Sequence, residues 1–170
     1  VAYTIVTAAA TSTDTNYNGV NASDVTVSNT DDDVAGVTVT PTSGLTTTEA
    51  GGTATFTVVL NTQPTTDVTI ALSSNRASEG IVAPAAITFT PATWSTPQTL
   101  TVTGIDDAVD DGDVTYVVIT APAQSTDPLY GGRDAADVTV VNIDNDSAGI
   151  TATPTSGLTA TEGGSTATFT

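Results

Sequence analysis

Carboxylates are the side chains of this sequence whose types and spacing suggest chemistry, and they gather in three places. Five aspartates fall between positions 106 and 113, Glu49 follows a run of threonines, and Asp144 and Asp146 close a later apolar segment. Two carboxylates about 4 Å apart repel by roughly 1 kcal/mol even in water. The two basic residues, both arginines, are too few to neutralise these groups. A bound cation is therefore the simplest way to stabilise the clusters.

Calcium is the cation that such clusters suit best. It takes about six to eight oxygen ligands from carboxylates and backbone carbonyls in a flexible geometry. The loop 106–113 joins two expected strands, and a sandwich collects its turns at two ends, so this loop, Glu49 and residues 144–146 are placed to meet at one end. The alternative interpretation is that these Asp-rich turns are simply solvated, as Asp-rich turns often are. We favour a calcium site.

An enzyme is not expected. The chain contains no His, Cys or Lys, so the common nucleophile and base arrangements are unavailable. A carboxylate pair such as Glu49 with Asp107 would be left for glycoside hydrolysis. That reaction needs a cleft, which a narrow repeated sandwich seldom provides.

The chain contains an internal repeat. The segment Asp31–Gly36 recurs as residues 144–149, so that Gly149 follows Gly36 by 113 positions. The same offset aligns residues 1–57 with residues 114–170 without an insertion, and 36 of the 57 pairs are identical. We therefore interpret the sequence as part of a tandem array. In this phasing residues 1–33 are the C-terminal part of a preceding repeat, 34–146 form a complete repeat, and 147–170 are the N-terminal part of the following one.

Composition restricts the partners. The formal net charge is −17, with 19 acidic against two basic residues, which disfavours nucleic acid and anionic membranes because both require clustered Lys and Arg. No apolar run approaches the roughly 20 residues that a membrane-spanning helix needs. Without cysteine, disulfides and thiolate metal sites are excluded.

The hydrophobic periodicity is two, which predicts β-strands. Segments such as Thr53–Val58 alternate apolar residues with threonine, a residue suited to a solvated sheet face. Turn residues divide seven expected strands, which predict an all-β, immunoglobulin-like sandwich in each repeat. The strands are 37–40, 53–60, 67–73, 86–90, 98–105, 114–120 and 136–143. The expected core comprises Val37, Val39, Ala54, Phe56, Val58, Leu60, Val68, Ile70, Leu72, Ile87, Phe89, Leu100, Val102, Val114, Tyr116, Val118, Val138 and Val140.

Residues between the strands receive simpler interpretations. Trp94 lies in a turn between two prolines and is expected to cap one end of the core rather than stack on a ligand. The isolated Asp67, Asp127, Asp134 and Asp137 are expected to be ordinary surface residues.

Several segments together resemble the Calx-beta family. They are Thr48–Thr57 (TEAGGTATFT), Ile87–Pro91 (ITFTP), Val102–Asp107 (VTGIDD) and Val140–Asp146 (VVNIDND). The resemblance covers the complete repeat and both partial ones. It implies a calcium-associated sandwich with an immunoglobulin-like arrangement.

The resemblance also implies the metal ligands. They would be an early glutamate, an Asp pair after the fifth strand and a terminal acidic triplet, which correspond here to Glu49, Asp106, Asp107, Asp110, Asp111, Asp144 and Asp146. The sequence departs from the family pattern at Asn145, where a third acid is usual, and in having Asp110, Asp111 and Asp113 where glutamates are common.

The array suggests a structural function. We expect a repeat of an extracellular or bacterial cell-surface fibre, stalk, adhesin shaft or filament, in which calcium stiffens the joints between repeats. Its partners would be neighbouring repeats or copies of itself, through an exposed edge strand in the latter case. The alternative is a calcium-dependent carbohydrate-binding module, for which Trp94 and Tyr130 are the candidate aromatic residues and glycans the partners.

Overall fold

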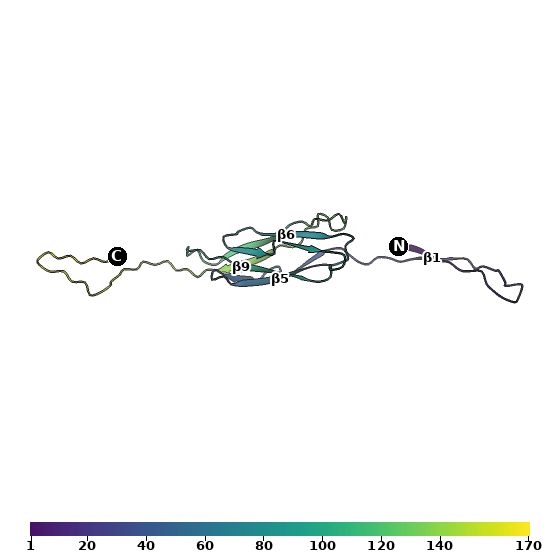
Figure 1. Cartoon of the computed structure of the whole chain (residues 1–170), viewed down its shortest axis with the longest axis horizontal. Helices are drawn as coiled ribbons and strands as arrows, with labels where there is room; N and C mark the ends of the chain where they lie inside the picture. Colours follow the sequence, from purple (N-terminus) through teal and green to yellow (C-terminus); the bar gives the residue numbers. More distant parts are fainter. The chain divides into compact units, whose positions relative to one another are not determined.

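The computed structural model describes residues Val1–Thr170 and consists of strands and turns (Figure 1). It divides into two units, Val1–Val34 and Ala35–Thr170. No helix is long and apolar enough to cross a membrane. The second unit contains the β-sandwich, and the two units are described separately below.

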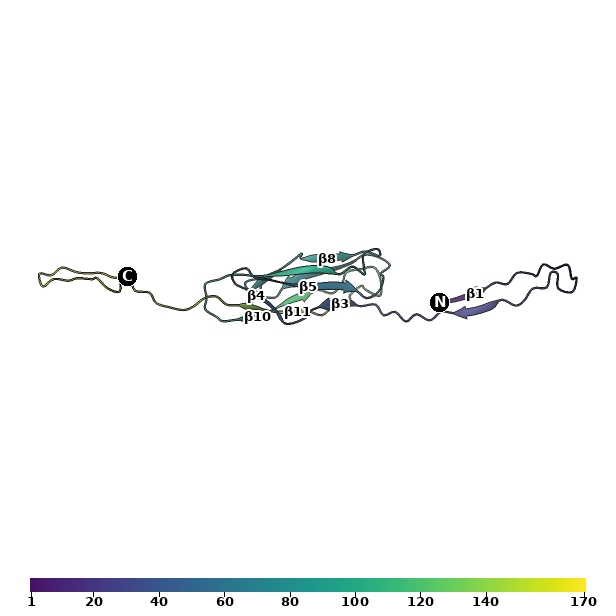
Figure 2. The ribbon, with the colours of Figure 1, turned by 90° about the horizontal axis from the view of Figure 1, so that it is seen from below.

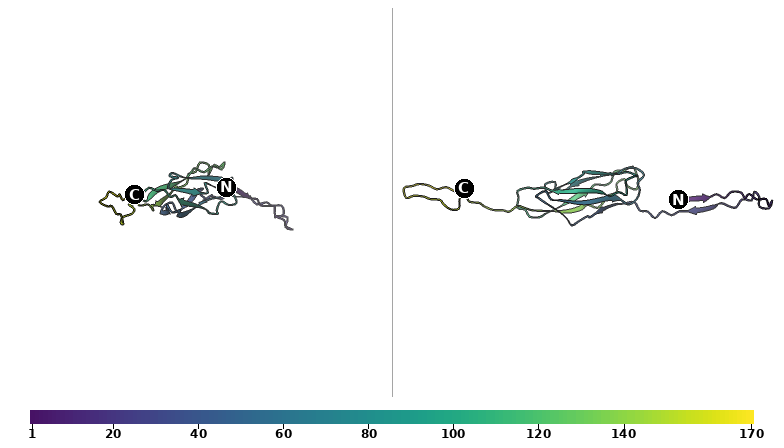
Figure 3. Two further views of the ribbon diagram at one scale, coloured as in Figure 1. Left: turned by 60° about the vertical axis from the view of Figure 1, so that its left-hand side comes forward. Right: turned by 60° about the horizontal axis from the view of Figure 1, so that its bottom comes forward.

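The sandwich is formed by two antiparallel-rich sheets that pack face to face, as Figures 2 and 3 show. One sheet has the order β4-β11-β10-β6-β8 and the other has the order β3-β5-β9-β7. The strands are β3 (Val37–Thr40), β4 (Leu45–Thr48), β5 (Thr53–Leu60), β6 (Val68–Ser74), β7 (Gly80–Ala83), β8 (Ala86–Phe89), β9 (Gln98–Gly104), β10 (Val114–Thr120) and β11 (Val138–Ile143). The predicted all-β, immunoglobulin-like class is confirmed.

The predicted core is largely the observed core. Phe56, Leu100 and Val118 are fully buried with most of the expected residues, because alternate side chains of each strand face the opposite sheet. Val37, Ala54 and Val114 are only half-buried. Trp94 packs against the core as a partly buried residue, in agreement with its predicted role as an end cap.

The predicted number of seven strands per sandwich is wrong, because β4 and β7 are additional. Strand β4 reads Leu-Thr-Thr-Thr and has no alternation of apolar and polar residues. It is a strand because it pairs in parallel with β11, from Leu45 opposite Val140 to Thr48 opposite Ile143. Strand β7 has four residues and is stabilised by pairing with β9. Both strands form through pairing with distant strands, which the local sequence pattern does not reveal.

The chain enters the sandwich at one end and leaves it at the other. Strand β3 starts with Val37 beside Leu60, where β5 finishes, and we call this the entry end. Strand β11 finishes with Ile143 beside Thr48, close to where β5 starts; we call this the exit end (Figure 1).

The first unit repeats the local structure of part of the sandwich. Its strands β1 (Ala2–Ile5) and β2 (Val25–Ser28) pair with Tyr3 opposite Val27. This is the register of Tyr116 opposite Val140 in β10 and β11, displaced by the repeat offset. Tyr3 is 52% exposed, whereas Tyr116 is 1% exposed within the two-sheet sandwich.

A buried lock at the entry end corrects one expectation. The sequence predicts Asp127 as a surface residue, but it is 2% exposed. Its Oδ2 accepts hydrogen bonds from the Thr65 backbone N–H at 2.7 Å and from Thr65 Oγ1 at 2.9 Å, and its Oδ1 accepts one from the Leu129 N–H at 2.8 Å. The N–H groups of Thr65 and Leu129 lower the pKa of Asp127. The carboxylate thus fastens the loop before β11 to the turn before β6.

Tyr130 completes this lock and provides a stability prediction. Its buried hydroxyl donates to the Thr62 carbonyl oxygen at 2.7 Å and accepts from the Thr62 N–H at 3.1 Å. Tyr130→Phe removes both hydrogen bonds and the 2.8 Å contact of the hydroxyl with Thr62 Oγ1, and is expected to lower the free energy of unfolding by about 1–2 kcal/mol. Chemical denaturation monitored by circular dichroism measures this difference, and a midpoint equal to that of the parent would show that the lock contributes nothing.

Candidate metal centre

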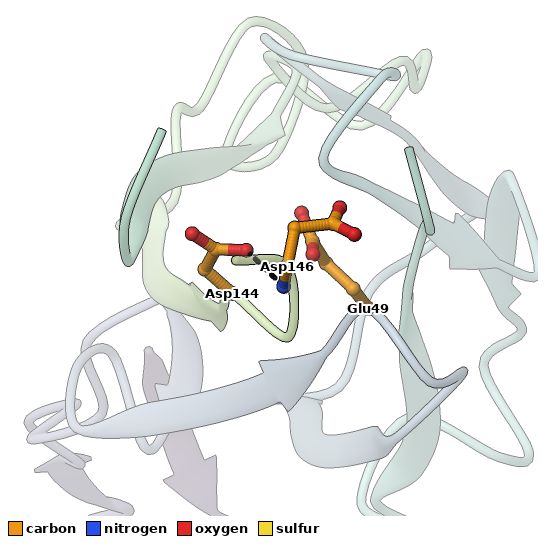
Figure 4. A group of neighbouring side chains, drawn as sticks. All are labelled: Glu49, Asp144 and Asp146. Atoms are coloured by element: carbon orange, nitrogen blue, oxygen red, sulfur yellow. Dashed lines mark hydrogen bonds between the residues drawn. The ribbon is translucent and has the colours of Figure 1, made fainter. Parts of the chain in front are cut away.

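Three carboxyl groups meet at the exit end of the sandwich. Ligand oxygens of Glu49, Asp144 and Asp146 all lie within 4.8 Å of one another (Figure 4). Glu49 directly follows β4, and the two aspartates follow β11. The parallel pairing of these strands continues past their ends, because the Glu49 N–H donates to the Ile143 carbonyl oxygen at 3.1 Å. Strand pairing thus brings residues about one hundred positions apart into one cluster.

Asp144 is held as a carboxylate by the backbone. Its Oδ1 accepts a hydrogen bond from the Asp146 N–H at 2.8 Å, and its Oδ2 accepts one from the Gly112 N–H at 2.8 Å. These N–H groups lower the pKa of Asp144. The backbone therefore fixes this side chain in its charged form.

Asp146 is the least satisfied side chain of the cluster. Its Oδ2 is buried and has no hydrogen-bond partner. Burial raises the pKa of Asp146, and the negative charges of Asp144, Asp106, Asp107 and Asp110 raise it further. A buried carboxylate oxygen without a partner is costly, so this atom is the strongest indication that the centre accommodates a further group.

Glu49 is 3% exposed, and its carboxylate accepts a hydrogen bond from the Asn145 N–H at Oε2, 3.1 Å away. That N–H lowers the pKa of Glu49, but burial together with the charges of Asp144 and Asp107 outweighs it, so the pKa lies above the ordinary value. Without a cation, this side chain is destabilised in its charged form.

The Asp-rich loop folds toward the same cluster at several points. Asp106 Oδ1 accepts a hydrogen bond from Asn145 Nδ2 at 3.0 Å, and Asp110 Oδ2 accepts one from the Ala148 N–H at 2.7 Å. The negative charge of Asp107 raises the pKa values of Glu49 and Asp146. The Oδ1 atom of Asp107 accepts a hydrogen bond within its own loop, from the Val109 N–H. Asp111 is exposed and makes no hydrogen bond to the cluster. Of the predicted ligands, Glu49, Asp144 and Asp146 thus form the cluster, and Asp106, Asp107 and Asp110 lie near enough for their charges to raise the pKa of Asp146.

Two residues outside the predicted ligand set connect the parts of the centre. Asn145 donates from its backbone to Glu49 and from its side chain to Asp106. Asp113 Oδ1 accepts a hydrogen bond from the Asp144 N–H at 3.2 Å. Asn145 departs from the acidic triplet of the Calx-beta pattern, but a neutral amide can donate a hydrogen bond, which a third carboxylate cannot.

The arrangement offers oxygen ligands and no nitrogen or sulfur ligands. Such a donor set suits hard cations, of which calcium tolerates the most irregular geometry. The aromatic residues considered for sugar binding are elsewhere, because the Trp94 carbonyl oxygen accepts from the Leu60 N–H and the Tyr130 hydroxyl contacts Thr62, both at the entry end. The exit end therefore has the chemistry of a cation site without an aromatic platform.

Comparison with known proteins shows distant similarity of fold. No protein family matches the chain, and no curated protein matches its sequence. The crystal structure of the apo form of the Calx CBD1 domain matches with a TM-score of 0.49 and 16% identity over 65% of this chain and 96% of that one. The calcium binding domain CBD12 of CALX1.1 matches with a TM-score of 0.49 and 19% identity over 66% of this chain and 47% of that one. The periplasmic chaperone SfaE matches with a TM-score of 0.49 and 14% identity over 64% of this chain and 58% of that one. The chain thus spans about half the length of the last two.

Proposed function

We propose that this chain is a structural repeat of an extracellular fibre, stalk or shaft, and that calcium bound at the exit end of each sandwich stiffens the joint to the next. The observation that supports the calcium site best is the buried, unpartnered Oδ2 of Asp146 between other carboxylates. A cation bound there would form a charge pair with the Asp146 carboxylate, which is otherwise desolvated and repelled by its acidic neighbours.

Glu49, Asp144 and Asp146 would hold the ion, with Asp106, Asp107 and Asp110 completing its surroundings. Calcium bound there would supply positive charge that offsets the repulsion among these groups. The protein residues would orient the ligands: the Gly112 N–H fixes Asp144, and the Asn145 N–H fixes Glu49. We place Asp111 at the rim, because it makes no hydrogen bond to these residues and its charge affects neither Glu49 nor Asp146.

The path of the chain supports the structural role. Each sandwich is entered at one end and left at the other, and the centre includes Asp144 and Asp146, the residues through which the chain leaves. Because Ala148 also donates to Asp110, the centre holds the first residues of the connection to the next repeat. An ion that orders these residues would restrict the joint itself.

Two measurements test this proposal. Isothermal titration calorimetry of the 170-residue chain with calcium is expected to show binding, and magnesium is expected to bind more weakly because it demands a stricter octahedral geometry. Electron microscopy of the intact protein is expected to show a thin fibre with an axial repeat on the order of 35–45 Å, from the rise of the strands and their end loops. Absence of calcium binding would reject the joint, and a compact particle would reject the fibre.

Neutralising the Asp pair of the loop gives a further prediction. The double variant Asp106→Asn, Asp107→Asn relieves repulsion on Asp146 and is expected to raise the melting temperature in chelator. The same change removes two negative charges from the centre and is expected to abolish most of the stabilisation by calcium. Scanning calorimetry with and without calcium measures both effects. If calcium stabilises this variant as much as the parent, the ion binds elsewhere.

A further inference from the structure

A buried polar network lies directly beneath the metal centre. The hydroxyl groups of Thr47 and Tyr116 are 3.1 Å apart, and Thr47 Oγ1 donates to Asn142 Oδ1 at 3.0 Å. Asn142 Nδ2 donates in turn to the Ile105 carbonyl oxygen at 3.1 Å. All three side chains are 1% exposed. Buried networks of this kind are rigid when every group is satisfied.

Two members of the network, and the carbonyl group that one of them binds, lie next to different parts of the centre. Thr47 is two residues before Glu49, and Asn142 is two residues before Asp144. The Ile105 carbonyl oxygen, which Asn142 binds, directly precedes Asp106. The network therefore ties together the three segments that supply carboxylates, although none of its side chains reaches the ligand oxygens by a hydrogen bond.

The surrounding backbone is adapted to this network. A Cβ at Gly104 would collide with the Thr48 carbonyl oxygen and with Asn142 Oδ1, and one at Gly80 would collide with the Tyr116 hydroxyl. Only glycine allows β9 to approach β4 and β11 so closely at this point. Burial raises the pKa of the Tyr116 hydroxyl, and the negative charge of Glu79 raises it further. The hydrogen bond with Thr47 lowers this pKa, but by less. Tyr116 thus stays neutral and able to donate.

We propose that the network of Thr47, Tyr116 and Asn142 positions the carboxylate segments before an ion arrives and so sets the calcium affinity of the centre. The inference rests on the calcium site proposed above. If the network is broken, the ion itself must order the three segments, and the lost conformational entropy weakens binding. Changes to groups that bind metal ligands directly typically cost about 10–100-fold in metal affinity, and this network acts one step further from the ion, so we expect an effect near the lower limit. These residues are positioning residues, since they act through the ligands.

Paired variants test the proposal on the 170-residue chain. Thr47→Val removes the hydroxyl at nearly constant shape, whereas Thr47→Ser keeps it. We expect the calcium dissociation constant to rise by about tenfold or more for Thr47→Val and Asn142→Ala, and to stay within about twofold of the parent for Thr47→Ser. Tyr116→Phe is the mildest change and is expected to give a smaller increase. Calorimetric titration with calcium measures the affinities, and melting temperatures in chelator report folding.

Tyr130→Phe is the matched control, because it removes the hydroxyl of another buried tyrosine at the entry end. It is expected to lower the melting temperature in chelator and to leave the calcium dissociation constant unchanged. A network that only stabilised the fold would make Tyr116→Phe behave in the same way.

The outcomes separate this inference from the calcium site. A parent chain that binds no calcium overturns the site and the positioning role with it. A parent that binds calcium, with Thr47→Val and Tyr116→Phe folded and equal to it in affinity, overturns the positioning role alone. If Asn142→Ala does not fold, Thr47→Val against Thr47→Ser decides the question.

Discussion

Calcium is expected to raise the melting temperature of the chain by about 10 °C. An ion at about one hundred times its dissociation constant stabilises the folded state by about 2.7 kcal/mol. For a domain near the length of one repeat, each kcal/mol shifts the melting temperature by about 4 °C. Scanning calorimetry in calcium and in chelator measures the shift. Asp144→Asn is expected to remove most of it, since Asp144 lies in the cluster and is held there as a carboxylate by two N–H groups.

Asp134→Asn is the control for this experiment. Asp134 is an exposed aspartate in the loop before β11, and its side chain makes no hydrogen bond. The substitution removes the same charge and is expected to leave the calcium shift intact. If Asp134→Asn and Asp144→Asn reduce the shift equally, calcium acts on the overall charge of the chain and not at the centre.

The pH dependence of stability is expected to reverse sign when calcium is added. In chelator, Glu49 and Asp146 have pKa values above their ordinary values of 4.5 and 3.8, so the folded chain binds protons more tightly than the unfolded chain. Stability should therefore rise as the pH falls from neutral toward these values. Asp144 and Asp127 have lowered pKa values, and the stability they contribute is lost only as the pH falls below about 3.8.

With calcium present, protons compete with the ion for Glu49 and Asp146. Acidification over the same range should then lower the melting temperature. Melting curves between about pH 7 and pH 4.5, with and without calcium, give the two slopes. The Asp106→Asn, Asp107→Asn variant should show a flatter slope in chelator, because two of the charges that raise the pKa of Asp146 are gone. Slopes of the same sign in both conditions would contradict this account.

The fold is predictable from the sequence where local pattern determines it. Alternation in segments such as Thr53–Leu60 and Val114–Thr120 identifies strands and their inward faces, since side chains of a strand point alternately to its two faces. The internal repeat supports the same choice of face, because Tyr116 has Tyr3 as its counterpart in the preceding copy. Strand β4 is not predictable, because its residues carry no pattern and only its pairing with β11 makes it a strand.

The candidate site is predictable in position more than in detail. Clustered aspartates at strand ends point to the exit end, because strand ends of a sandwich converge. Single polar residues are not predictable, since a lone Asp127 or Thr47 has no neighbours in sequence that reveal its partners. Asp127 is buried against Thr65, and Thr47 against Asn142, both through contacts more than sixty positions away. In the following copy Ala160 stands where Thr47 stands, so the positioning hydroxyl is a feature of individual repeats.

The entry and exit of the chain at opposite ends of the sandwich also bear on mechanical load. Tension applied to Ala35 and Asp146 would pull β3 and β11 along their own lengths in opposite directions. Strand β11 is paired with β4 on one side and β10 on the other, so it would have to slide past two neighbours with many hydrogen bonds loaded together. The hydrogen bonds would be loaded together in shear, rather than broken one after another by peeling. A cation bound at the end of β11 would have to be released before the first of these bonds breaks.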